Sequence, residues 1–319
     1  MRNTPVGFGW VIQPAHLQAD ERATLRADNQ KFLDLIRDKF QTVWFEDHFE
    51  DVGRYKHHDR LEGWTHLCYL LPQFPELHFG TLVLGQSYRN PALVAKMAST
   101  LQYLSNGRLI LGIGAGWHEA EYRSYGWRFP PPGERVRQLD EYTQIVRLML
   151  RQSPVSFAGK YYTIKDAHND PLPETPIPLM IGGSGERGTL RTAAQYGDWW
   201  NFGLKPAEEF ASKCEVLKQH CVEVGRDFDE IVLSVFQFIS LSEEPSRVVS
   251  VPGVHVIGGN ADAVTRELES FIKLGARHFM LRFADFPRTE GVELFLQKVL
   301  PRLRPSRPLG EGLGVRDQG

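Results

Sequence analysis

Hydrophobic positions along the chain fall into two alternating kinds of segment. Short runs rich in β-branched and aromatic residues, typical of buried strands, are separated by longer stretches in which apolar residues recur at helical spacing. The strand-like runs occupy residues 6–12, 42–46, 79–84, 109–113, 177–181, 199–202, 231–240 and 278–283. Strands that alternate with helices pair in parallel, and eight such units are the number that closes a barrel. The pattern therefore predicts an α/β protein built as a (β/α)8 TIM barrel.

Helical patterns fill most of the gaps between these runs. They cover residues 25–39, 91–104, 133–151, 187–196, 207–224, 263–274 and 292–303. Pro91 and Pro206 stand at helix starts, where a residue without an N–H costs nothing, and Gly225 and Gly275 follow helix ends. The turn residues thus support the same element boundaries as the periodicity.

The alternation is interrupted between residues 151 and 176. The run Phe157-Ala-Gly-Lys-Tyr-Tyr-Thr-Ile alternates like a β-hairpin, and a proline-rich connection follows it. We interpret this stretch as an insertion between the fourth and fifth units. Residues 1–305 are expected to form one barrel domain, and the glycine-rich residues 306–319 to form a disordered tail.

Composition narrows the classes of function. A formal net charge of -2 with both signs mixed predicts neither nucleic-acid binding nor attachment to an anionic membrane, so the expected partner is a small-molecule substrate. Three cysteines without paired spacing argue against a disulfide framework, and no metal-ligand spacing of histidine and cysteine occurs, so we expect no metal. Without a signal-like N-terminus or a long apolar run, the chain is predicted to be cytoplasmic.

Candidate chemistry gathers at the end of the second predicted strand. In a parallel barrel the catalytic groups collect at the carboxyl ends of the strands, where the following loops converge. Glu46, Asp47 and His48 stand at that point. Because histidine titrates near neutral pH and a neighbouring carboxylate can hold its tautomer, we take His48 and Asp47 as candidate catalytic residues. The alternative is that such a cluster only packs the strand end.

A first glycine-rich turn, Gly112-Ile-Gly114-Ala115-Gly116, follows the fourth strand. Glycines without Cβ atoms let backbone approach a bound ring or phosphate, although a tight turn alone would also explain them. Trp117 comes directly afterwards. Large aromatic residues are more often core than pocket, but we expect Trp117 and Trp10 to line the substrate pocket, Trp117 because it stands at a strand's carboxyl end.

A second turn, Gly182-Gly183-Ser184-Gly185, follows the fifth strand and satisfies G-x-G-x-x-G through Gly188. Exposed N–H groups at a helix start favour a phosphate. In a dinucleotide-binding Rossmann fold, however, this motif usually opens the domain, whereas four strand–helix units precede it here. We therefore expect a phosphate cradle within a barrel, made by the N–H groups of these four residues.

The motifs, taken in order, resemble those of the luciferase-like monooxygenase superfamily. They are Val43-Trp-Phe-Glu-Asp-His-Phe, Phe79-Gly-Thr-Leu-Val-Leu-Gly, Arg89-Asn-Pro-Ala, Gly107-Arg-Leu-Ile-Leu-Gly-Ile-Gly-Ala-Gly-Trp and Ile181-Gly-Gly-Ser-Gly-Glu-Arg. The resemblance spans residues 6–302 and is strongest to the branch that uses coenzyme F420, a deazaflavin.

This resemblance implies a cofactor ring at the barrel mouth, against a non-prolyl cis peptide that would join Leu82 to Val83. It also implies that Asp47 and His48 touch the ring and the substrate. Relatives in this branch carry a glutamate directly after the Gly-x-Gly of the fourth strand. Here that position is Trp117, which puts sugar-phosphate dehydrogenase activity in doubt.

Several functions remain open at this stage. The leading hypothesis is hydride transfer between coenzyme F420 and a small organic substrate. The second is an FMN-dependent monooxygenase that receives reduced flavin from a partner flavin reductase and uses O2. A barrel that only stores or senses flavin and a Rossmann-type nicotinamide dehydrogenase are further alternatives. The sequence fixes neither the substrate nor the assembly, for which a homodimer is one option.

Overall fold

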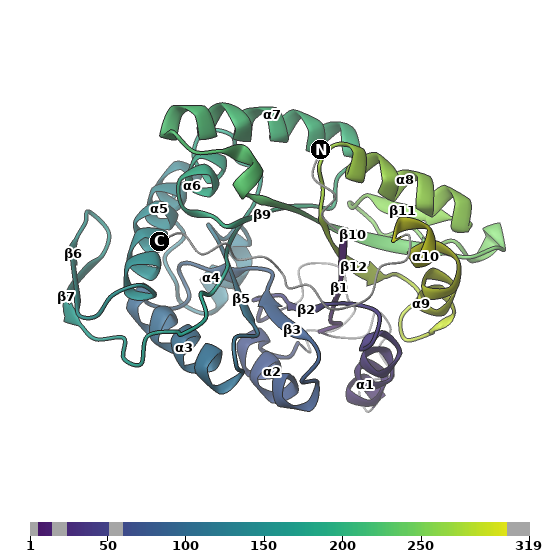
Figure 1. The fold of residues 1–319 in the computed structure, drawn as a ribbon, viewed down its shortest axis with the longest axis horizontal. Helices are drawn as coiled ribbons and strands as arrows, with labels where there is room; N and C mark the ends of the chain where they lie inside the picture. Colours follow the sequence, from purple (N-terminus) through teal and green to yellow (C-terminus); the bar gives the residue numbers. More distant parts are fainter. Residues whose placement is uncertain (1–5, 15–23, 51–59, 305–319) are drawn as a thin grey trace.

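The computed structural model describes residues 6–14, 24–50 and 60–304. Eight parallel strands form a closed barrel, which confirms the predicted (β/α)8 architecture (Figure 1). They are β1 (Gly7–Val11), β2 (Thr42–Phe45), β3 (His78–Thr81), β5 (Leu109–Gly114), β8 (Leu179–Gly182), β9 (Trp199–Gly203), β10 (Val232–Leu241) and β12 (His278–Phe283). The barrel closes because β10 pairs with both β9 and β12, and β12 pairs with β1.

Two short parallel strands extend this sheet. β4 (Leu84–Gly85) pairs with the end of β5, and β11 (Val256–Gly259) pairs with the end of β10. The predicted strand 79–84 is therefore divided into β3 and β4. Between them lies a cis peptide that joins Leu82 to Val83, as the resemblance implied.

Helices surround the barrel (Figure 1). The described helices are α1 (Leu25–Ile36), α2 (Gly63–Leu70), α3 (Pro91–Leu104), α4 (Glu119–Ser124), α5 (Pro132–Met149), α6 (Thr189–Tyr196), α7 (Ala207–Val224), α8 (Ala261–Lys273), α9 (Glu290–Leu294) and α10 (Leu300–Leu303). The short helices α2 and α4 were not predicted from the sequence. One helix was predicted over 292–303, where a π-helical turn, Phe295–Val299, separates α9 from α10. Pro301 lacks the N–H that a regular helix would need there.

The predicted hairpin is confirmed between α5 and β8. Its strands β6 (Val155–Ala158) and β7 (Thr163–Ala167) pair antiparallel and project from the side of the barrel (Figure 1). The predicted disordered tail, 306–319, lies outside the described residues. Within the described part of the chain, no helix is long and apolar enough to cross a membrane.

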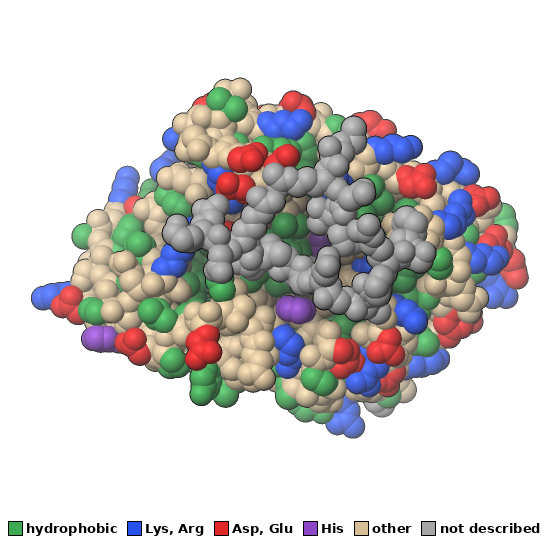
Figure 2. Space-filling view, in the orientation of Figure 1, with side chains coloured by type: hydrophobic (Ala, Val, Ile, Leu, Met, Phe, Trp, Pro, Cys, Tyr) green, Lys and Arg blue, Asp and Glu red, His purple; other side chains and the backbone are tan. Residues whose placement is uncertain are grey.

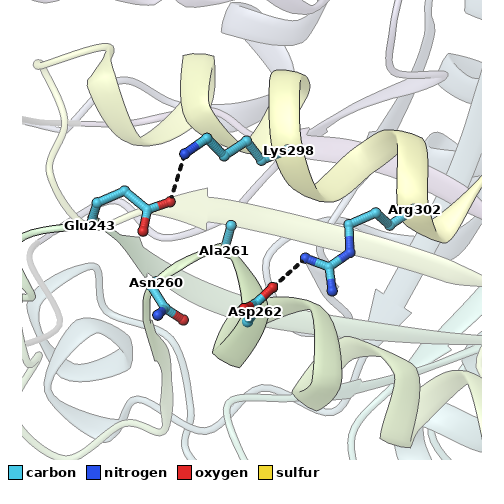
Figure 3. A pocket seen from close by; sticks show the side chains of 6 residues that line it. All are labelled: Glu243, Asn260, Ala261, Asp262, Lys298 and Arg302. Atoms are coloured by element: carbon cyan, nitrogen blue, oxygen red, sulfur yellow. Dashed lines mark hydrogen bonds and ion pairs between the residues drawn. The ribbon is translucent and has the colours of Figure 1, made fainter.

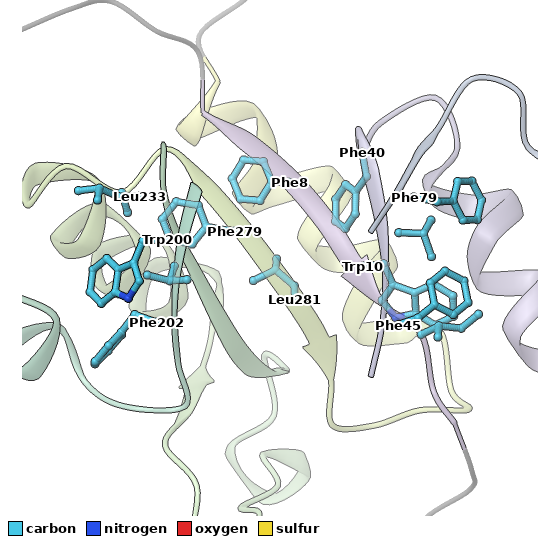
Figure 4. Close-up of a cluster of buried hydrophobic side chains, with 14 of the residues drawn as sticks. Phe8, Trp10, Phe40, Phe45, Phe79, Trp200, Phe202, Leu233, Phe279 and Leu281 are labelled. Atoms are coloured by element: carbon cyan, nitrogen blue, oxygen red, sulfur yellow. The ribbon is translucent and has the colours of Figure 1, made fainter. Parts of the chain in front are cut away.

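Alternate residues of each strand face opposite sides of the barrel wall. One set packs outward against the helices and includes Phe8, Trp10, Phe45, Phe79 and Trp200 (Figure 4). The other set fills the interior and includes Val11, Trp44, Ile110, Met180 and Met280. Since the interior is packed with side chains, chemistry is confined to the carboxyl ends of the strands.

The indole of Trp44 shows how the interior is filled. A Cβ atom on Gly80 would lie 2.2 Å from this ring, and one on Gly9 would lie 2.5 Å from its Nε1. The indole N–H donates to Thr42 at 2.6 Å, and the Thr42 hydroxyl also lies 2.8 Å from the His278 ring. Glycines on the neighbouring strands therefore make room for one large side chain in the barrel.

Candidate active site

His48 follows β2 and is held by a carboxylate that lies 73 residues further along the chain. Its Nδ1 lies 3.1 Å from Oε2 of Glu121, whose side chain is fully buried on α4. An ionised carboxylate can only accept, so Nδ1 of His48 is the donor in this hydrogen bond, and Nε2 is the ring nitrogen that Glu121 does not bind. Glu121 was not among the predicted site residues, because nothing in its local sequence separates it from the exposed acidic residues of a short helix.

Glu121 is surrounded by hydrogen-bond donors. The Tyr88 hydroxyl donates to Oε2 at 2.7 Å, and the backbone N–H groups of Phe49 and Glu50 donate to Oε1. Burial by itself would raise the pKa of Glu121, but the hydrogen bonds from His48 and Tyr88 lower it to about 2. These donors therefore favour the ionised form of Glu121, and its hydrogen bond to Nδ1 fixes the orientation of the His48 ring.

Asp47 has a different partner, although it precedes His48 directly. Arg89 donates to both of its carboxylate oxygens at 2.9 Å, and the Gly85 N–H donates to Oδ2 at 2.9 Å. Arg89 also pairs with Glu62, the residue that caps α2. Burial raises the pKa of Asp47 to about 6 despite these donors. Asp47, which precedes His48 in the sequence, therefore connects β2 with β4 and α2. The carboxylate that contacts the imidazole is that of Glu121.

A third charged group lies at the same end of β2. Glu46 accepts hydrogen bonds through one oxygen, Oε2, from Arg60 at 2.6 Å and from Arg282 of β12 at 3.0 Å. Burial alone would raise the pKa of Glu46, but the two guanidinium groups hold it far below its usual range. Arg60 also donates to the His48 carbonyl oxygen at 3.1 Å. Arg60 therefore fixes the backbone of His48, and Glu121 fixes its ring.

One glycine from each turn makes room for Val83, the second residue of the cis peptide. A Cβ atom on Gly114 would lie 2.6 Å from the Val83 side chain, and one on Gly182 would lie 2.8 Å from it. These two glycines, predicted to let a cofactor approach, are thus already explained by packing of the valine. Gly116 has a φ of +74°, which favours glycine, and lies under the Tyr122 hydroxyl.

The second turn leads into α6. Gly183 has a φ of +116°, and its N–H donates to the Asn201 carbonyl oxygen at 3.2 Å. The N–H of Gly183 is consequently engaged within the protein and is not a free phosphate donor, which corrects that part of the expected cradle. Ser184 and Gly185 are exposed just before the helix. They remain the candidates for holding an anion at this helix start.

The two tryptophans expected in the substrate pocket lie in different environments. Trp117 is 57% exposed, and its ring meets that of His48 edge to face at 5.4 Å between centroids. Trp10 is fully buried and stacks on Phe32 of α1 at 5.3 Å. The expectation for Trp10 was wrong because its strand position faces the helix layer, not the barrel mouth.

A second group of charged side chains lies in a separate pocket. A pocket between α8 and α10 is lined by Glu243, Asp262, Lys298 and Arg302, and its charges pair with each other (Figure 3). Acidic and basic side chains are interspersed over the visible face of the molecule (Figure 2). Among the described residues, no group of three or more histidine, cysteine and acidic side chains is arranged to hold a metal ion.

Comparison with known proteins assigns the family. The sequence profile of the luciferase-like monooxygenase family matches residues 8–279. A closed parallel barrel with its polar residues gathered at the strand ends is the architecture of a barrel enzyme. The chain belongs to the luciferase-like monooxygenase family, whose members are flavin- or F420-dependent oxidoreductases and monooxygenases.

Relatives of both kinds are similar to this chain. An F420-dependent glucose-6-phosphate dehydrogenase of Amycolatopsis mediterranei is 26% identical over 304 residues, covering 82% of this chain and 90% of the relative. A pyrimidine monooxygenase, RutA, of Stutzerimonas stutzeri is 27% identical over 271 residues, covering 68% of this chain and 72% of the relative. A solved F420-dependent secondary alcohol dehydrogenase shares the fold with a TM-score of 0.80 at 19% identity, covering 94% of this chain and 99% of that one.

Proposed function

We propose that this protein is an F420-dependent oxidoreductase in which His48 moves the proton that accompanies hydride transfer. The observation that carries the proposal is the His48–Glu121 pair, in which Glu121 binds Nδ1 of a ring that packs against Trp117, while Nε2 has no hydrogen-bond partner among the described residues. A titratable group held in a single tautomer at the mouth of a barrel is what proton transfer requires. A barrel that only stored the cofactor would not need it.

The residues around the mouth fit a flavin-like group. Val83 packs against Gly114 and Gly182, and the partly exposed residues Val83, Ala115 and Gly116 would offer an apolar surface to an aromatic ring, next to the cis peptide from Leu82. Ser184 and Gly185, in the exposed loop that leads into α6, would hold the phosphate. When bound, the deazaflavin supplies hydride chemistry, and the protein supplies orientation and electrostatics.

Within this arrangement each protein group has a separate task. His48 accepts or releases a proton at Nε2, and the anionic Glu121 stabilises the imidazolium that forms. Asp47 acts at a distance, because through Gly85 and Arg89 it holds the segment that follows Val83. Trp117 would form a wall of the substrate pocket. Trp117 stands where the sugar-phosphate dehydrogenases of this branch have a glutamate. We therefore do not propose glucose 6-phosphate as the substrate of this chain.

An FMN-dependent monooxygenase is the second candidate, and the similarity to pyrimidine monooxygenases favours it. It would require a flavin reductase as partner and O2 as co-substrate. The test is titration of the purified protein with F420 and with FMN, each in oxidised and reduced form, followed by fluorescence. Tighter binding of F420 with anaerobic turnover supports the first proposal. Preference for reduced FMN with O2 consumption contradicts it.

A further inference from the structure

One oxygen of the Glu121 carboxylate is shared by two side chains. Oε2 accepts from the Tyr88 hydroxyl at 2.7 Å and from Nδ1 of His48 at 3.1 Å. The other oxygen, Oε1, accepts from the backbone N–H groups of Phe49 and Glu50. The negative charge of Glu121 is therefore divided among these donors, and Tyr88 and His48 bind the same atom.

The Tyr88 hydroxyl is a donor to this carboxylate. Burial and the hydrogen bond to Glu121 both raise the pKa of Tyr88, so the hydroxyl keeps its proton at neutral pH. A hydrogen bond to an ionised group stabilises that charge, and each further donor reduces the charge that the carboxylate offers to the others. Tyr88 therefore weakens the attraction of Glu121 for a proton on His48.

The ring of Tyr88 is fixed by packing against other side chains. It lies 4.4 Å from the ring of Trp127 and 5.2 Å from that of Phe49, measured between centroids. A Cβ atom on Gly85 would lie 2.7 Å from the Tyr88 ring, so β4 also passes close to it. Because these contacts involve the ring, a variant that lacks only the hydroxyl should keep the ring in place.

Charged and titratable groups reach His48 from other elements as well. The carboxylate of Glu46, directly after β2, interacts electrostatically with the imidazole. Arg60, which precedes α2, donates to the His48 carbonyl oxygen, and the His118 ring, before α4, lies 6.1 Å from the His48 ring between centroids. The Tyr88 hydroxyl donates to Glu121, so its removal is expected to act on His48 through that carboxylate.

We propose that Tyr88 is a positioning residue that, through Glu121, sets the pH range in which His48 gains and loses its proton. With the hydroxyl present, the carboxylate is shared, and His48 releases its proton at a lower pH than it would without this sharing. The inference deepens the proposed function and rests on it only in linking this pH range to turnover. The coupling of the three side chains does not depend on which cofactor is bound.

The experiment follows the titration of the His48 ring by NMR, with its signals assigned from His48→Ala. In Tyr88→Phe the midpoint of this titration is expected to rise by about half a pH unit, because the carboxylate then holds the imidazolium proton more tightly. The limb of the pH–rate profile that reports His48 should move in the same direction. Tyr162→Phe is the control, since it removes a half-buried hydroxyl that donates to Gln86 and should leave the midpoint unchanged.

Two further variants test the mechanism. In the Glu121→Gln background, Tyr88→Phe should shift the midpoint much less, because the charge that the hydroxyl modulates is gone. Difluorotyrosine in place of Tyr88 is a stronger donor than tyrosine and should lower the midpoint. This second substitution keeps the test decisive if Tyr88→Phe does not fold.

Several results would overturn the proposal. They are an unchanged or lowered midpoint in folded Tyr88→Phe, an equal shift in Tyr162→Phe, the full shift in the Glu121→Gln background, and an unchanged or raised midpoint with difluorotyrosine. A shifted NMR midpoint with an unaltered pH–rate profile would uphold the coupling and reject His48 as the proton-transfer group of the proposed function. A pH–rate profile that depends on His48 but not on Tyr88 would reject the role of Tyr88 and leave the proposed function standing.

Discussion

Nδ1 of His48 lies 3.1 Å from Oε2 of Glu121, and the two residues come from different strand–helix units of the barrel. The carboxylate is buried and receives three further donors, so its position does not depend on the histidine alone. A fixed acid that orients a half-buried imidazole separates the roles of the two residues. In the proposed function His48 moves the proton, while Glu121 orients its ring.

Replacement of His48 by alanine should remove the proton-transfer group. Turnover per folded enzyme is expected to fall by roughly 10² to 10⁴, with little change in cofactor affinity. Steady-state kinetics and cofactor titration on the same preparation measure both quantities. His168→Ala, an exposed histidine on the hairpin side, is the control. A rate within about twofold of wild type would exclude the catalytic role.

Glu121→Gln should lower turnover through His48 without changing cofactor affinity. The neutral amide no longer stabilises the imidazolium, so turnover should fall by about 10- to 100-fold and the pH–rate profile should change shape. Glu121→Asp, which keeps the charge, should recover part of the rate. A loss of stability with an unaltered pH–rate profile would instead assign Glu121 a structural role.

Ser184→Asp places a negative charge where the phosphate is expected. Repulsion of the phosphate should weaken cofactor binding by at least about tenfold, whereas Ser184→Ala should change it much less. Because Ser184 is exposed, neither variant should alter the unfolding temperature noticeably. Equal cofactor affinities of the two variants would show that the phosphate is not bound at this turn. Gly183 is a poorer test site, because its φ of +116° strains any other residue.

Acid should destabilise the fold through His278. Burial lowers the pKa of this histidine to about 3, below the value of about 6.5 expected in the unfolded chain. The unfolded state therefore binds a proton first, and stability is full above about pH 6.5 and falls as the pH drops toward 3. The slope from this one group is at most about 1.4 kcal/mol per pH unit.

Denaturant unfolding at a series of pH values measures the effect. His278→Asn should flatten the dependence between pH 6 and 4, even though it lowers stability at neutral pH by removing the contact with Thr42. His66, whose pKa burial lowers to about 4, contributes in the same direction and should remain active in this variant. An unchanged slope would show that His278 is not the group responsible.

Local sequence determined where the helices and strands form. The strand runs, the helical spacing and the hairpin near Phe157 follow from side-chain periodicity and turn residues, which act between near neighbours. The position of the cis peptide between Leu82 and Val83 came from the family motif. His48 and Trp117 were placed at strand ends for the same local reason, and they lie together in the structure.

Only the tertiary structure decided which of these residues meet. Glu121 reaches His48 across 73 residues, and Arg282 reaches Glu46 across 236. Since such pairings depend on how the strands close into a barrel, no local pattern could choose Glu121 over Asp47 as the histidine's partner. Trp10 was misplaced because residues 6–12 are apolar almost throughout, so their alternation does not show which face is inside. Barrel closure alone assigns Trp10 to the helix layer and its neighbour Val11 to the interior.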